Sequence, residues 1–99
     1  MKIDFSKELI GYDGEPLKEG DKIITLAMVC CNALGNPAPD EAQLPGEEKA
    51  RRFDLAVAVY ASKGPLDLKV EQVALIKSLI GKLYGPMVVG PVWKLLEGE

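Results

Sequence analysis

Residues 70–84, VEQVALIKSLIGKLY, form the clearest amphipathic helix in the chain and predict a mainly helical fold. Large aliphatic residues recur at the three- and four-residue spacing that places them on one helical face. That face comprises Val70, Val73, Leu75, Ile76, Leu79, Ile80 and Leu83, and the opposite face comprises Glu71, Gln72, Lys77, Ser78 and Lys82. A glycine such as Gly81 costs a helix interior about 1 kcal/mol relative to alanine. Its presence indicates a close crossing with another helix.

Two more helices are predicted upstream of this one. Residues 25–34 form the first, with Thr25 as its N-cap and Gly35 placed for a left-handed C-cap. Residues 46–62 form the second, which carries an apolar stripe at helical spacing, broadened by Leu55 and Val59. The stripe comprises Phe53, Ala56, Val57 and Tyr60. Between these helices, residues 35–46 form the longest loop.

The two ends of the chain are predicted to differ in structure. Residues 2–20 alternate and then turn at Asp13-Gly14, which predicts a β-hairpin. Residues 66–68 form a short extended link, and residues 87–97 form a last helix that Gly90-Pro91 could split into two half-turns. The predicted fold class is therefore mostly α (α+β). A single domain over residues 1–99 would hold an N-terminal β-hairpin followed by a small bundle of three to four helices.

We expect the core to lie between the second and third helices and to include Phe53, Val57, Tyr60, Ile76 and Ile80. Residues 84–96 are almost entirely apolar, with Lys94 as their one charge. A chain this small buries only a modest share of its surface. This segment therefore either completes the core or forms part of a surface for self-association or for a partner.

The composition is that of an ordinary globular domain. The chain has 99 residues, of which 47% are hydrophobic and 27% charged. These proportions exclude a disordered tail, a collagen-like fibre and a disulfide scaffold. The longest uncharged run, residues 23–39, is too short and too broken to span a bilayer. We therefore expect a cytosolic protein with no membrane association.

The net charge and the absence of histidine narrow the range of possible functions. The net charge is −3, and no segment has the positive excess that binding to a phosphate backbone needs, so nucleic acid is a disfavoured partner. The chain has no histidine, which excludes a Ser–His–Asp triad, a Cys–His dyad and a His-based zinc site within one chain. No cofactor, metal ligand set or catalytic residue is predicted.

Cys30 and Cys31 are the two cysteines, and they are adjacent. Neighbouring Cα atoms lie about 3.8 Å apart, which is below the usual disulfide range of roughly 4.4–6.8 Å. We expect both thiols to be reduced and largely buried on the first helix, which favours a reducing compartment. A vicinal redox pair or soft-metal site is the alternative.

Three polar groups have two readings each. Glu47 and Glu48 could act as paired acid and base groups, but helix-start charges explain them as well. The segment Asp13-Gly14-Glu15 lacks the alternating ligands of a calcium loop and suits a turn. The basic residues Lys49, Arg51 and Arg52, together with Lys63, either form a solvated face or bind phosphate or an acidic partner. The candidate partner surface joins them to the C-terminal apolar segment and comprises Lys49, Arg51, Arg52, Tyr84, Met87, Val89 and Trp93.

Five stretches of turn and helix sequence follow one another along the chain and carry a family resemblance. They are residues 10–17, 46–56, 66–77, 79–84 and 88–96. Together they resemble small uncharacterised proteins encoded in tailed bacteriophages and prophages. The resemblance covers most of the chain except the loop at 35–44. It implies a phage setting and a non-enzymatic role, and it brings no site residues.

The leading hypothesis is a phage-encoded protein–protein interaction factor in the bacterial cytosol, which serves particle assembly or binds a host protein. We expect a homo-oligomer with Trp93 or its neighbours near the contact. The alternative is a small nucleic-acid-binding transcriptional regulator of a phage, with Arg51, Arg52, Lys77 and Lys82 toward phosphate. A histidine-free enzyme is the least favoured possibility.

Overall fold

The computed structural model describes residues 1–97. Its elements in chain order are β1 (Lys2–Asp4), β2 (Lys18–Glu19), β3 (Lys22–Ile23), α1 (Leu26–Gly35), α2 (Gly46–Ala61), β4 (Pro65–Asp67), α3 (Val70–Leu83) and α4 (Pro86–Leu96). The predicted class is confirmed: the fold is mostly helical, with a small β component at the N-terminus. Each helix agrees with its predicted bounds to within one residue.

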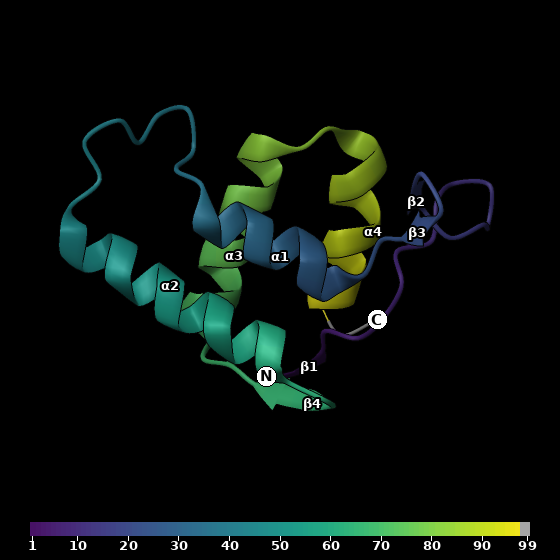
Figure 1. Ribbon diagram of the computed structural model, residues 1–99, viewed down its shortest axis with the longest axis horizontal. Coiled ribbons are helices and arrows are strands. Elements are labelled where there is room, and N and C mark those ends of the chain that lie inside the picture. Colours follow the sequence, from purple (N-terminus) through teal and green to yellow (C-terminus); the bar gives the residue numbers. More distant parts are fainter. Residues whose placement is uncertain (98–99) are drawn as a thin grey trace.

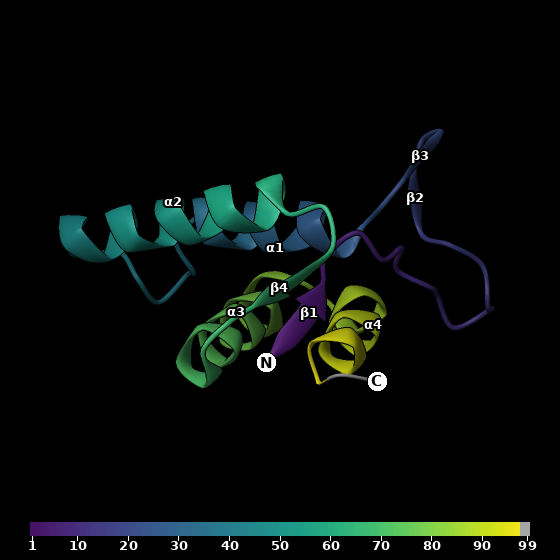
Figure 2. The same ribbon diagram turned by 90° about the horizontal axis from the view of Figure 1, so that it is seen from below.

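The helices form two layers, with α1 and α2 in one layer and α3 and α4 in the other (Figures 1 and 2). Helix α1 is the central element, because both α2 and α3 pack on it, and α4 packs on α3. Helices α2 and α3 hardly touch each other. The expected core between these two helices is therefore wrong as an arrangement, since each of them packs on α1 rather than on the other.

The ends of α1 show one cap as predicted and one that differs. The Thr25 hydroxyl accepts from the Met28 backbone N–H at 3.4 Å, as expected of an N-cap. The predicted left-handed C-cap at Gly35 is wrong, because Gly35 is the last helical residue and Asn36 follows in extended conformation. The Asn36 side chain instead donates to the Asn32 carbonyl at 2.8 Å and satisfies a free carbonyl of the last turn.

The N-terminal segment turns twice, at Gly14 and at Gly20, both of which have positive φ. Ile10 bridges Pro16 across the predicted Asp13-Gly14 turn, and β2 pairs with β3 across the second turn. Three backbone hydrogen bonds connect Leu9, Leu17 and Ile24 with one another. They are Leu17 N–H to Leu9 O, Ile24 N–H to Leu17 O and Leu9 N–H to Ile24 O, at 2.8, 2.9 and 3.0 Å. The hairpin of β2 and β3 projects from the helical body (Figure 2).

Strand β1 does not join this hairpin. It pairs antiparallel with β4, in the register Ile3 opposite Leu66. The expected extended link at residues 66–68 is thus largely the strand β4, which the sequence could not assign because its partner lies at the other end of the chain. The ladder places Ile3 and Phe5 in the core below α1.

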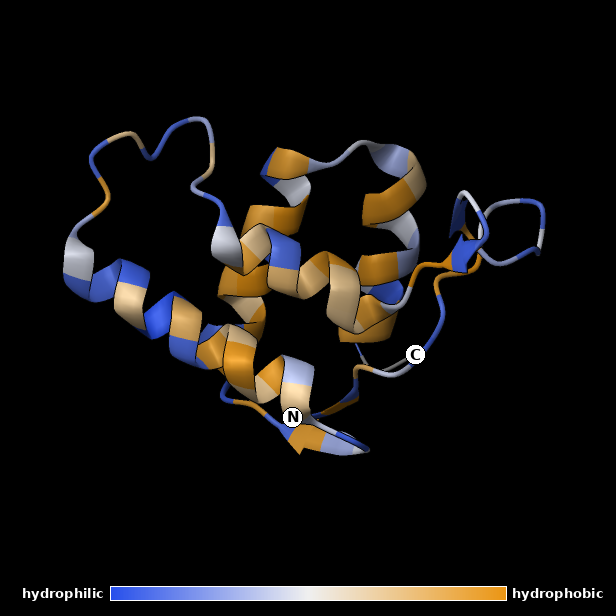
Figure 3. Cartoon of the chain, viewed as in Figure 1, coloured by the Kyte–Doolittle hydropathy of each residue, from blue (hydrophilic) through white to orange (hydrophobic). Residues whose placement is uncertain are grey.

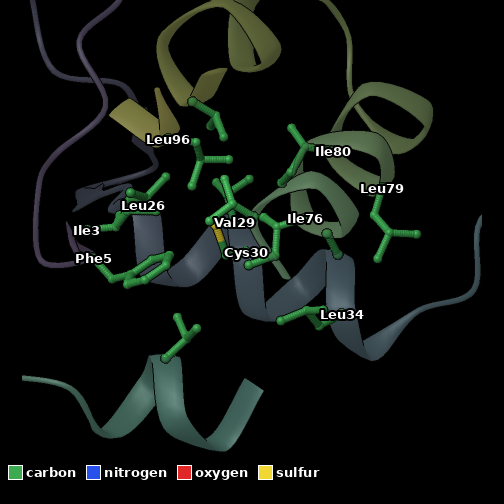
Figure 4. Packing of buried hydrophobic residues seen from close by; sticks show 14 of the residues in the cluster. Ile3, Phe5, Leu26, Val29, Cys30, Leu34, Ile76, Leu79, Ile80 and Leu96 are labelled. Atoms are coloured by element: carbon green, nitrogen blue, oxygen red, sulfur yellow. The ribbon is translucent and has the colours of Figure 1, made fainter. Parts of the chain in front are cut away.

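The core gathers around α1, where Phe5, Leu26 and Cys30 meet Ile76 and Ile80 of α3 (Figure 4). The predicted burial of Ile76 and Ile80 is confirmed. The predicted burial of Phe53, Val57 and Tyr60 is wrong, because α2 turns Leu55 and Val59 inward instead. The apolar arc of α2 is wider than its contact with α1, and only one side of that arc is covered.

Helix α4 is continuous through Pro91. Val92 and Leu96 are fully buried, and Val88, Val89 and Leu95 pack against the core. The close crossing inferred from Gly81 exists: a Cβ added there would lie 3.3 Å from Cζ2 of Trp93. Within residues 1–97, no helix has the length and apolar character to cross a membrane.

Candidate interaction surface

A row of large apolar side chains lies on the outer face of α2. Phe53, Val57 and Tyr60, called the α2 row below, are 66%, 50% and 82% exposed. Their spacing of four and three residues places them on one side of the helix, one turn after another. The second half of α2 is correspondingly apolar, whereas its first half is polar (Figure 3). Such a row of exposed aromatic and aliphatic residues is typical of a contact surface.

Two shallow hollows flank the α2 row where α2 meets α1. The first, of about 300 Å³, is lined by Cys31, Ala56, Val57, Tyr60 and Ala61. The second, of about 360 Å³, reaches the loop before α2 and is lined by Leu34, Gly35, Asn36, Pro37, Leu44, Lys49, Arg52, Phe53 and Ala56. Small residues line the first hollow beside Val57 and Tyr60, and Phe53 lines the second. The surface therefore offers both protruding rings and depressions to a partner.

Arg52 does not belong to this exposed surface. It is 4% exposed and lies under the loop, where Nη1 and Nη2 donate to the two carboxylate oxygens of Glu41 at 2.8 and 2.6 Å. Nε donates to Glu48 at 3.2 Å. These bonds from Arg52, together with the Ala38 N–H, lower the pKa of Glu41 to about 2. The same contacts raise the pKa of Arg52.

The three basic residues predicted to act together are therefore separated. The expectation that Arg52 belongs to a solvated face or to an exposed partner surface is wrong: Arg52 is buried, and two carboxylates compensate its burial. Arg51 is exposed and pairs with Glu48 at 2.9 Å. Lys49 is exposed one turn before Phe53, in line with the α2 row. Of the three, only Lys49 extends the apolar row.

The C-terminal residues of the predicted partner surface divide between the core and the surface. Tyr84 and Val89 are half-buried, and the Tyr84 hydroxyl accepts from Asn32 Nδ2. Trp93 is 37% exposed; its N–H donates to the Lys77 carbonyl at 3.2 Å and its ring lies under the Lys77 ammonium. Met87 is 50% exposed. Residues 84–96 thus contribute to the core and leave Met87 and Trp93 as their exposed large apolar side chains.

A second concave surface, the α2–α3 groove, opens between the helices that do not pack together. It holds about 660 Å³. Its floor is apolar and its rim carries more acidic than basic groups. The apolar lining residues, called the floor below, are Leu55, Ala58, Leu66, Leu68 and Leu75, and the polar lining residues, called the rim, are Glu48, Arg51, Arg52, Asp54, Asp67, Glu71 and Gln72.

The helical spacing of the α2 row predicts a buried face, although the row is exposed. The signal for the correct face was the spacing of Glu48, Arg52, Leu55 and Val59, which also recurs at helical intervals. A basic residue in that pattern argued against burial, and its acidic partner Glu41 lies in the loop. The groove had no sequence signal, since it depends on the separation of two helices.

Both cysteines are free, as expected; the predicted burial is confirmed for Cys30, whereas Cys31 is only half-buried. Burial raises the pKa of each thiol. Within residues 1–97, no group of three or more His, Cys, Asp or Glu side chains is arranged to hold a metal ion. No family model, curated protein or solved structure matches the chain.

Proposed function

We propose that this chain is a small non-enzymatic interaction factor that associates with other protein molecules, first with its own copies, through the α2 row. The observation that carries the proposal is the exposure of Phe53, Val57 and Tyr60 on one helical face. Exposure of large apolar side chains to water is unfavourable, and burying them in a contact with another molecule lowers the free energy. The contact expected around Trp93 is the weaker candidate, because that ring packs on α3.

The resemblance to small phage-encoded proteins suggests the setting, which is the bacterial cytosol during particle assembly or the capture of a host protein. Self-association suits assembly better. The alternative of a nucleic-acid-binding regulator loses support, because Arg51 pairs with Glu48, and the buried Arg52 pairs with Glu41 and Glu48. Releasing Arg52 for phosphate would break the ion pair that holds the loop.

Sedimentation velocity across a series from low micromolar to high micromolar protein tests the proposal. We expect the mass of the wild-type chain to rise with concentration, and the double variant Phe53→Ser, Tyr60→Ser to stay monomeric. The double variant Ile10→Ser, Tyr12→Ser is the matched control, since both residues are exposed and apolar and belong to the N-terminal segment, away from α2. A monomeric wild-type chain over the whole series would overturn the proposal.

A further inference from the structure

We infer that copies of this chain associate head to tail, with the α2 row of one copy seated in the α2–α3 groove of the next. This inference rests on the proposed function and names the surface that the row contacts. Its occupant is a second copy of the chain, and the argument comes from position, apolar character and charge.

The row and the groove lie on opposite sides of the same helix. Phe53 and Leu55 are separated by about 200° around an α-helix, which has 3.6 residues per turn. Phe53 projects from the outer face, while Leu55 and Ala58 line the groove. One copy can therefore offer both surfaces at once. Because the two surfaces differ, their contact leaves a free row at one end and a free groove at the other, and further copies can add.

The apolar surfaces match in kind. The groove floor is leucine-rich and open because α2 and α3 do not close over it. Leu66 and Leu75 on that floor are half-exposed and gain cover when aromatic rings enter. The row is convex, with side chains from three successive turns, whereas the groove is concave over about 660 Å³. A convex aromatic row fits this groove better than it fits a second convex row.

The charges match as well. Asp54 on the α2 wall and Glu71 on the α3 wall are exposed and form no ion pair within residues 1–97. Lys49 extends the row and has no ion pair in the same range. Docking brings the Lys49 ammonium to the acidic rim, and complementary charge of this kind sets the register of a contact.

The size of the contact predicts weak association. A helix of 16 residues is about 24 Å long and roughly 10 Å wide, so one helical face covers much less than the roughly 800 Å² per partner of a standard interface. We therefore expect association that appears only at elevated concentration, and the measurements must extend to high micromolar protein.

A mixing experiment tests the inference. The row variant is Phe53→Ser, Tyr60→Ser, and the groove variant is Asp54→Lys, Glu71→Lys, which leaves the apolar core unchanged. We expect each variant alone to be monomeric by sedimentation. Mixed in equal amounts, they should form a 1:1 dimer and nothing larger, because the groove variant keeps its row and the row variant keeps its groove. The charge control is Glu15→Lys, Asp21→Lys, which changes the net charge by the same amount but at the N-terminal segment. It should associate like wild type.

A charge swap gives a second readout on the same surfaces. Adding Lys49→Glu to the groove variant should restore part of the association. The end of the row is then acidic and the rim of the groove is basic, so the charges are again complementary. Two results together would overturn the head-to-tail contact. In the first, adding Lys49→Glu does not restore association of the groove variant. In the second, the mixture of the row and groove variants stays monomeric.

The failures of the two proposals are distinguishable. If the wild-type chain associates, the row variant does not, and the groove variant associates like wild type, then rows contact rows and only the head-to-tail inference falls. If the wild-type chain is monomeric throughout, both proposals fall.

Discussion

The guanidinium of Arg52 donates to both carboxylate oxygens of Glu41, at 2.8 and 2.6 Å, and so joins α2 to the loop that precedes it. Glu41 also accepts from the Ala38 N–H at 3.0 Å. A two-pronged contact of this kind fixes direction as well as distance. The loop at residues 36–45 is thereby held over one end of the candidate interaction surface.

Removing the acidic partner should destabilise the fold. Glu41→Ala leaves the buried Arg52 with Glu48 as its one remaining carboxylate, and we expect a loss of about 1–3 kcal/mol in the free energy of unfolding. Urea denaturation measures this loss. Glu15→Gln is the control and should change the free energy by less than about 0.5 kcal/mol, since that side chain is exposed. Equal stability of Glu41→Ala and wild type would show that the pair does not hold the loop.

The same pair predicts a dependence on pH. The pKa of Glu41 is lowered to about 2 in the folded protein, whereas that of an unfolded glutamate is about 4.3. The stabilisation is fully present above the unfolded value and is lost as pH falls through the folded value. Wild type should therefore lose more stability than Glu41→Gln between about pH 4.5 and pH 2, as measured by thermal unfolding. Parallel pH profiles for the two proteins would contradict this.

The two faces of α2 should respond differently to truncation. Leu55 is 7% exposed, so Leu55→Ala should cost about 2–5 kcal/mol. Phe53 is 66% exposed, so Phe53→Ala should cost less than about 1 kcal/mol in dilute monomer. Chemical denaturation at low protein concentration compares them. A larger loss at Phe53 than at Leu55 would mean that the helix is rotated from the face described above.

The adjacent thiols should differ in reactivity. Cys30 is fully buried and its pKa is strongly raised, whereas Cys31 is half-buried and lines a surface hollow. At pH 8, iodoacetamide should modify Cys31 slowly and leave Cys30 unmodified until the protein unfolds. Mass spectrometry of peptides locates the label. A native intramolecular disulfide, or faster labelling of Cys30, would contradict the packing of α1.

The sequence by itself determined the elements whose signals are local. The period of residues 70–84 placed Ile76 and Ile80 in the core, Thr25 began α1, and Gly81 marked the approach of Trp93. These features depend on residues a few positions apart, or on a missing side chain, so spacing and propensity are sufficient. The absence of histidine likewise excluded whole classes of active site without any structure.

Which apolar face of α2 is covered depends on contacts between distant parts of the chain. Helix α2 has two faces at helical spacing; the face with Leu55 and Val59 is turned inward, and the loop covers Arg52. The choice depends on Glu41, which reaches Arg52 from the loop, and on the packing of α2 against α1. The β1–β4 ladder joins residues more than sixty positions apart. Such contacts form because the whole chain minimises its exposed apolar surface and unpaired polar groups together, which no short window of sequence contains.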